Sequence, residues 1–155
     1  MSEVAHLLAE LVRIPSINPS GEEPSTPDQG EERLARFILE YFRQHGVSCE
    51  LQDWRLGRPN VIARVPGAAP GPALVLQTHM DTVAVDDMTI PPFAAQTSEG
   101  RLAGRGACDA KASLAAMMTA LVRLQRGAPP PQECVLVAVA DEEYGHGGVA
   151  RYLQG

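Results

Sequence analysis

Acidic residues and one histidine gather at three places in this chain, each beside a strand-like or glycine-rich run. The residues are His79 with Asp81, then Asp109, and then Glu142 with Glu143. In open α/β sheets, ligand sites lie outside the carboxyl ends of the strands. One imidazole and several carboxylates gathered there suit a divalent metal such as zinc. The three places are therefore predicted to form one metal site.

The pair His79 and Asp81 directly follows the apolar run 73–78. Residues i and i+2 of a strand point to the same side. Asp81 is therefore placed to accept a hydrogen bond from the imidazole nitrogen that is not on the metal, as carboxylates do when they orient a ligand histidine. The alternative is a loop histidine that happens to lie beside a loop aspartate.

Asp109 ends a glycine-rich approach and precedes a long apolar helix pattern. A carboxylate is favoured at a helix N-terminus, so a simple N-cap is the first alternative to a metal ligand. Phosphate binding is the second, because Gly104 and Gly106 match two glycines of the dinucleotide fingerprint. The acid stands where the third glycine belongs, however, and it would repel a pyrophosphate.

Glu142 and Glu143 directly follow the apolar run 134–140. Adjacent strand residues face opposite ways, so both can reach one site only if the strand has already ended in a turn. The following residues include three glycines, which permit such a turn. One glutamate could then hold a metal while the other takes a proton from water. A solvated acidic loop is the alternative.

The elements that must position these residues alternate between helix and strand patterns. Helices are expected at 4–12, 34–42, 112–124 and from 148 to 153, and strands at 47–51, 60–65, 73–78, 101–103 and 134–140. The continuous apolar runs at 73–78 and 134–140 are typical of strands buried on both faces. The loop 14–30 is expected to be exposed. The alternation predicts a layered α/β fold.

Composition excludes several classes of protein. The 155 residues fit one domain or part of a larger one, and the net charge of -6 argues against a nucleic-acid surface. No apolar run approaches the ~20 residues of a membrane span, and the N-terminus does not resemble a signal peptide. Cys49, Cys108 and Cys134 are odd in number and form no Cys-x-x-Cys pair, which favours reduced thiols and a cytoplasmic protein.

Four other residues have side chains that could take part in such a site. Cys108 has no partnered histidine pattern that would make it a nucleophile. Lys111, the only lysine, could line the site or be solvated. His146 is near the site by sequence position only, and His45 is expected near a helix C-terminus, where a cation is favoured.

Four segments together resemble the di-zinc metallopeptidases, the family that includes acetylornithine deacetylase, succinyl-diaminopimelate desuccinylase, aminoacylase and glutamate carboxypeptidase. They are Pro15–Glu22, Gln77–Val83, Pro92-Phe93 with Gly100–Lys111, and Asp141–Gly145, in the order and spacing of that family. One departure is Ala112, where the family usually has glycine.

The resemblance implies a role for each candidate residue. His79 would bind one Zn²⁺, Glu143 the other, and Asp109 would bridge both, followed by a peptide bond that is often cis in the family. Asp81 would orient His79, and Glu142 would be the general base and acid. Co²⁺ is a possible substitute for zinc. The implied fold is a three-layer mixed, largely parallel sheet with helices on both faces, here an incomplete catalytic domain.

The resemblance also implies that residues 1–155 are the N-terminal part of the catalytic domain, without the lid and dimerisation domain and the C-terminal part. Each zinc would keep two protein ligands here, whereas a catalytic zinc normally has three. The implied activity is hydrolysis of an amide bond in an N-acyl amino acid or small peptide, absent from this piece alone; full-length relatives are often homodimers. A non-catalytic remnant or binding module of the same fold is the alternative.

Overall fold

A computed structural model of the chain describes residues 2–155. These residues form four helices and six strands. In chain order they are α1 (Glu3–Arg13), α2 (Glu32–Gln44), β1 (Ser48–Arg55), β2 (Arg58–Val65), β3 (Leu74–His79), β4 (Gln96–Ser98), β5 (Arg101–Ala103), α3 (Lys111–Arg126), β6 (Cys134–Val139) and α4 (Gly147–Leu153). Every helix and strand expected from the sequence is present, and β4 is an addition that pairs with β5.

The main sheet has the strand order β1-β2-β6-β3. The pairs β1–β2 and β2–β6 are antiparallel, and β3 and β6 run parallel. Antiparallel pairing thus predominates in this part of the sheet, which corrects the expectation of a largely parallel one. For the pair β1–β2 the cause is the tight hairpin through Leu56 and Gly57, since a two-residue turn can only connect antiparallel strands.

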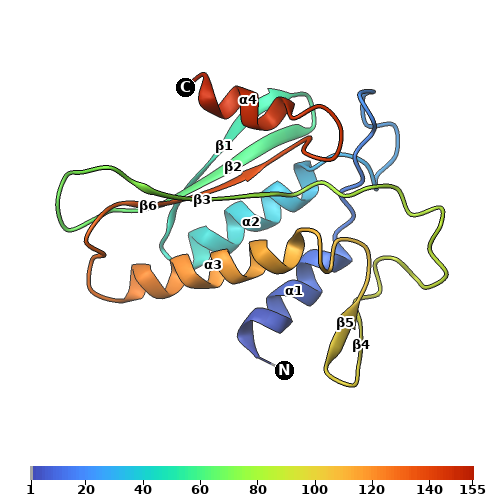
Figure 1. Ribbon diagram of the computed structural model, residues 1–155, viewed down its shortest axis with the longest axis horizontal. Coiled ribbons are helices and arrows are strands. Elements are labelled where there is room, and N and C mark those ends of the chain that lie inside the picture. Colours follow the sequence, from blue (N-terminus) through green and yellow to red (C-terminus); the bar gives the residue numbers. More distant parts are fainter. Residues whose placement is uncertain (1) are drawn as a thin grey trace.

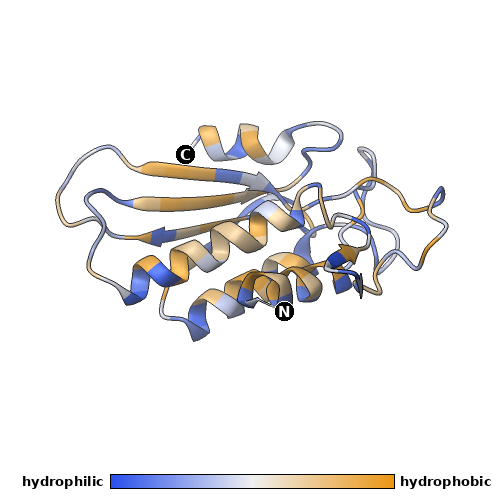
Figure 2. Cartoon of the chain, turned by 60° about the horizontal axis from the view of Figure 1, so that its bottom comes forward, coloured by the Kyte–Doolittle hydropathy of each residue, from blue (hydrophilic) through white to orange (hydrophobic). Residues whose placement is uncertain are grey.

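Helices cover both faces of the sheet, as expected for the three-layer α/β fold. Helices α1, α2 and α3 lie on one face and α4 lies on the other (Figure 1). The larger core cluster joins the three helices to the sheet, and a smaller one joins β2 and β6 to Val149 and Tyr152 of α4. The strands between these layers are mostly hydrophobic (Figure 2). Among the described helices, none is both long and apolar enough to cross a membrane.

The two apolar strands differ in burial. All six residues of β6 are buried, as predicted, because this strand lies between β2 and β3. The expectation that 73–78 is buried on both faces is wrong for its first half, since Leu74 is 46% and Val75 45% exposed. β3 is the edge strand of the described sheet, and only its carboxyl end, with Thr78 and His79, is buried.

The loop 14–30 is only partly exposed, which corrects a second expectation. Ser16 and Asn18 are buried, and the loop pairs with the segment after β3 through the bridge between Ile17 and Thr82. The Ser16 hydroxyl donates to the carbonyl of Met80 at 2.7 Å. The first part of the loop is therefore fixed against the carboxyl end of β3, where the predicted site lies.

Candidate metal centre

The structure brings His79, Asp109 and Glu143 together at the carboxyl ends of β3 and β6. One ligand atom from each residue lies within 4.8 Å of the others. His79 is the last residue of β3 and pairs in register with Val139 of β6, so the parallel strands deliver the histidine and the acidic turn to the same sheet edge. Asp109 comes from the segment before α3. One imidazole and two carboxylates are a suitable donor set for zinc.

The imidazole of His79 is fixed from both sides. Its Nε2 lies 3.0 Å from Asp109 Oδ1 and 3.7 Å from Glu142 Oε2. Its Nδ1 lies 3.0 Å from the backbone carbonyl oxygen of Asp81 and 3.5 Å from the Asp81 carboxylate, so the carbonyl is the hydrogen-bond acceptor and the carboxylate a nearby charge. Burial alone would lower the pKa of His79, but the surrounding carboxylates outweigh it and raise the pKa to about 9.

Asp81 fixes the glutamate pair through the backbone. Its carboxylate accepts hydrogen bonds from the peptide N–H groups of Glu142 (3.1 Å) and Glu143 (2.9 Å) and from the Asn18 side chain (2.7 Å). Burial would raise the pKa of Asp81, but its interaction with His79 and these three hydrogen bonds outweigh burial and hold the pKa below its usual range. The end of β3 and the turn after β6 are thereby joined at the site.

The turn after β6 begins at Asp141, which lies in the left-handed region with φ 65°. A non-glycine residue rarely adopts this conformation, and here it ends the strand so that Glu142 and Glu143 can both face the site. The expectation of a turn at this point is confirmed, although the residue that makes it is Asp141 and not one of the glycines. Burial and the neighbouring carboxylates, Asp109 foremost, raise the pKa of Glu143 against the effect of His79.

Asp109 does not cap α3. The N-cap residue is Ala110, without a side-chain hydrogen bond, and the Asp109 side chain is 77% exposed. The peptide bond between Asp109 and Ala110 is cis. Gly106 has φ 77°, and a Cβ there would lie 2.8 Å from Thr82 Cγ2, so the backbone passes too close for any side chain.

Lys111, His45 and His146 lie outside the cluster. Lys111 is neither solvated nor in the site: it is fully buried and its Nζ donates to the carbonyls of Leu11 (3.1 Å) and Ile14 (2.7 Å) at the end of α1. Burial lowers the pKa of Lys111 to about 7. His45 is the C-cap of α2, as predicted, whereas His146 is the exposed N-cap of α4.

Three polar residues behind the site were not recognised from the sequence. Asn18, Glu31 and Arg58 are buried, and together with Asp141 they form a network that reaches Asp81. The only local signal is an arginine shortly before the strand expected at 60–65. That signal does not indicate a partner, because the contacts span 27 to 123 residues of sequence.

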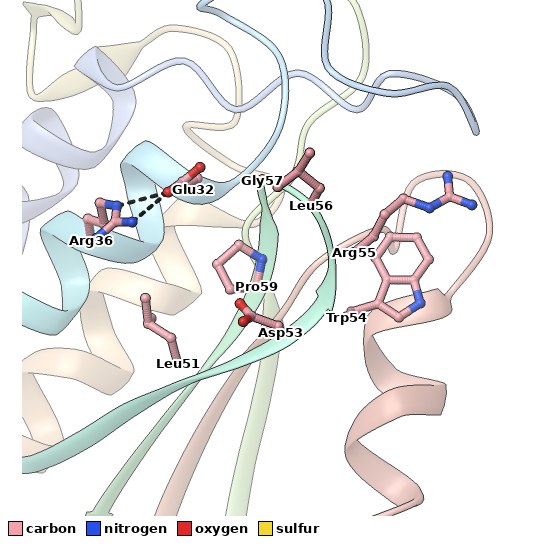
Figure 3. A pocket seen from close by; sticks show the side chains of 9 residues that line it. All are labelled: Glu32, Arg36, Leu51, Asp53, Trp54, Arg55, Leu56, Gly57 and Pro59. Carbon is pink, nitrogen blue, oxygen red and sulfur yellow. Dashed lines mark hydrogen bonds and ion pairs between the residues drawn. The ribbon is translucent and has the colours of Figure 1, made fainter.

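A well-defined concavity of the described surface lies elsewhere. It has a volume of about 480 Å³ and lies between the start of α2 and the β1–β2 hairpin, with Glu32, Arg36, Leu51 and Pro59 in its wall (Figure 3). The five candidate residues do not line it. The metal cluster is an open arrangement of side chains at the sheet edge, so cavity size does not identify it.

An α/β sheet with a histidine and carboxylate cluster at its carboxyl edge is the architecture of a metallohydrolase of the peptidase type. Residues 75–155 match the family model of Peptidase family M20/M25/M40. That match covers more than half of the chain and includes all five candidate residues. The chain belongs to this family, which the sequence motifs had indicated.

Two solved structures and one curated relative illustrate the similarity. The chain is 36% identical to succinyl-diaminopimelate desuccinylase of Methylococcus capsulatus over 158 residues, which cover 99% of the chain and 38% of that relative. It superposes on an M20 family metallo-carboxypeptidase from Sulfolobus solfataricus with a TM-score of 0.81 and 26% identity, covering 99% of the chain and 34% of that structure. A dinuclear metal binding peptidase of the M20 family from Bacillus subtilis has the same fold, with a TM-score of 0.66, 18% identity and coverage of 97% and 38%. The chain thus spans little more than a third of each.

Proposed function

We propose that this chain is the N-terminal part of the catalytic domain of a zinc-dependent amidohydrolase. The substrate is an N-acyl amino acid or a small peptide, and its amide bond is hydrolysed. The observation that carries the proposal is the cluster of His79, Asp109 and Glu143 at the carboxyl edge of the sheet. Family membership and the similarity to a desuccinylase and a metallo-carboxypeptidase support the reaction class.

The residues present fit a divalent cation. Four carboxylates surround one imidazole. Their negative charge raises the pKa of His79 against the effect of burial, and burial together with the neighbouring carboxylates raises the pKa of Glu143. His79 Nε2 and Asp109 Oδ1 share a hydrogen bond of 3.0 Å, and a metal cation would replace the proton between them. His79 would hold one zinc, Glu143 the second, and Asp109 both; Co²⁺ could substitute. Bound zinc supplies Lewis-acid activation of water and of the amide carbonyl.

Glu142 is the proposed general base and acid. Its carboxylate is 42% exposed and lies 3.7 Å from His79 Nε2, so it is beside the cluster and open to substrate. It takes the proton of the attacking water and delivers it to the nitrogen of the leaving amine. Asp81 contributes by position: it holds the backbone of Glu142 and the ring of His79, so that base and ligand keep a fixed distance.

The number of ligands supports the view that further metal ligands come from residues of the full-length protein outside 1–155. Three ligands for two metals leave two protein ligands each, whereas catalytic zinc normally has three. The unpaired edge at β3, with Leu74 and Val75 about half exposed, supports the same view. We expect residues 1–155 alone to hydrolyse no amide and to self-associate, and the full-length protein to be active.

A substrate panel on the full-length protein tests the proposal. With Zn²⁺ or Co²⁺ supplied, N-succinyl and N-acetyl amino acids and dipeptides should be hydrolysed, and Glu142→Gln should lose at least ~100-fold in kcat. Asp87→Asn, an exposed carboxylate between β3 and β4, is the matched control. If metal binds and no amide is cleaved, the chain is the non-catalytic module that its incomplete ligand set also allows. Hydrolysis by a monomeric fragment 1–155 would contradict the divided site.

A further inference from the structure

We infer that Arg58 is a positioning residue for the metal centre. It holds Asp141 in the left-handed turn from which Glu142 and Glu143 reach the site. The inference rests on the proposed function of that site, and it assigns a role to a buried ion-pair network that lies behind the metal ligands.

Arg58 is fully buried and uses its whole guanidinium fork. Its Nε and Nη2 donate to the two carboxylate oxygens of Glu31 at 2.9 and 2.7 Å. Its Nη1 donates to Asp141 Oδ1 at 2.9 Å. Both acids are buried as well: Glu31 is fully buried and Asp141 is 3% exposed. Removal of the arginine would therefore leave two desolvated carboxylates without their cation, which is strongly unfavourable.

Asp141 is fixed at every polar group. Besides Arg58, its Oδ1 contacts Asn18 Nδ2 at 3.2 Å, and its Oδ2 accepts the N–H of Gly147 at 3.1 Å. Its own N–H donates to Glu31 Oε1 at 3.1 Å, and its carbonyl accepts the N–H of His146 at 2.6 Å. A residue with φ 65° persists only where the surroundings over-determine it.

Trp54 closes the network on the outer side. Its ring lies over the Arg58 guanidinium, 5.1 Å from centroid to Cζ. It also abuts Gly147 so closely that a Cβ there would meet the indole. Figure 3 shows the indole beside the start of α4, at the edge of the concavity that it helps to line. Desolvation by the ring strengthens the ion pairs beneath it.

Asn18 connects this network to the metal centre. The same amide nitrogen donates to Asp141 at 3.2 Å and to Asp81 at 2.7 Å. Asp81 in turn accepts the N–H groups of Glu142 and Glu143. The base and the metal ligand are thus fixed twice, at the turn by Asp141 and at their backbone by Asp81. Arg58 acts on the first of these anchors without touching the metal ligands.

Amide hydrogen exchange on the full-length protein tests the inference directly. In Arg58→Met, the amides of 141–143 should exchange about tenfold faster than in wild type. The amides of β6 should not accelerate more than they do in a control variant that destabilises the fold elsewhere. Met118→Ala is that control, because it opens a cavity in the core of α3 and destabilises the fold without touching the network. Arg58→Lys keeps the positive charge but loses the guanidinium that bonds both Glu31 and Asp141. It should therefore restore part of the protection of amides 141–143 from exchange. The Co²⁺ dissociation constant should rise about tenfold in Arg58→Met and less in Arg58→Lys.

Equal acceleration at 141–143 and in β6, as in Met118→Ala, would show that Arg58 stabilises the fold only and would overturn the inference. Unchanged exchange at 141–143 would overturn it too. If Arg58→Met does not fold, Arg58→Lys is compared with wild type on the same peptides, and selective acceleration at 141–143 is again required. The proposed function fails by a different result, namely absence of Co²⁺ binding by the wild type, and the exchange measurement in metal-free protein does not depend on it.

Discussion

Replacement of Asp81 by asparagine should destabilise the metal-free protein although the side chain keeps its shape. The carboxylate is 1% exposed and accepts hydrogen bonds on both oxygens, from Glu142 on Oδ1 and from Glu143 and Asn18 on Oδ2. An asparagine has one oxygen only. Whichever way its amide turns, at least one buried N–H loses its acceptor and faces another donor.

The magnitude follows from that count. Loss of one hydrogen bond to a charged acceptor costs about 1.5–3 kcal/mol, and a buried donor left without a partner costs about 1–3 kcal/mol. These two costs overlap, so we expect the free energy of unfolding to fall by about 3 kcal/mol. Asp81→Asn also removes the charge beside His79, and the pKa of His79 should fall from about 9 towards its ordinary value.

Urea unfolding in the presence of a chelator measures the first effect, and an NMR titration of the His79 ring measures the second. Asp87→Asn is the matched control, since it makes the same change at an exposed position and should stay within about 0.5 kcal/mol of wild type. An unfolding free energy of Asp81→Asn within 1 kcal/mol of wild type would refute the view that this carboxylate holds the glutamate turn.

Three further outcomes are expected. Asp109→Asn should abolish zinc binding in isothermal titration, and an unchanged titration curve would remove Asp109 from the site. Because the pKa of His79 is raised, a metal ion must displace a proton at any pH below ~9. Apparent metal affinity should therefore rise about tenfold per pH unit up to ~9 and then level off. In metal-free protein the same proton stabilises the fold fully below ~6.5, and this contribution is lost as pH rises through ~9. Gly148→Ala should lower the free energy of unfolding in urea by about 3 kcal/mol or more, because its Cβ would lie 2.2 Å from the Ala140 carbonyl oxygen. Gly71→Ala, whose Cβ would meet nothing within 4 Å, should be near neutral. Equal effects of the two substitutions would contradict the close packing at Gly148.

Much of the fold could be predicted because its signals are local. Helix periodicity and the apolar run of β6 depend on neighbouring residues, and both are found where the sequence placed them. The burial of β3 could not be predicted in the same way. Its apolar run resembles that of β6, but exposure depends on strand order, and β3 lies at the edge. Strand order is a property of contacts that are distant in sequence.

The same distinction applies to the site. The rule that sites lie at the carboxyl ends of strands led us to expect His79 beside the Glu142–Glu143 pair, whereas the choice of Asp109 and Glu143 as ligands came from the family resemblance. The structure brings His79, Asp109 and Glu143 together. The partners of Asp81 could not be expected, because it binds the backbone of Glu142 and Glu143, and a peptide N–H has no residue type to recognise. Arg58 was missed since its acids are distant in the chain.

The carboxylates around the site divide into two groups with different tasks. Asp81 and Asp141 are buried, and each accepts several hydrogen bonds, so their charge is already satisfied by the protein. Asp109 and Glu142 are 77% and 42% exposed and contact chiefly His79. A cation that binds to the exposed group therefore competes with one proton and with water, and not with the hydrogen bonds that keep the turn in place. We therefore expect the chain to hold the geometry of the proposed metal site before a metal binds, with little reorganisation energy lost on binding.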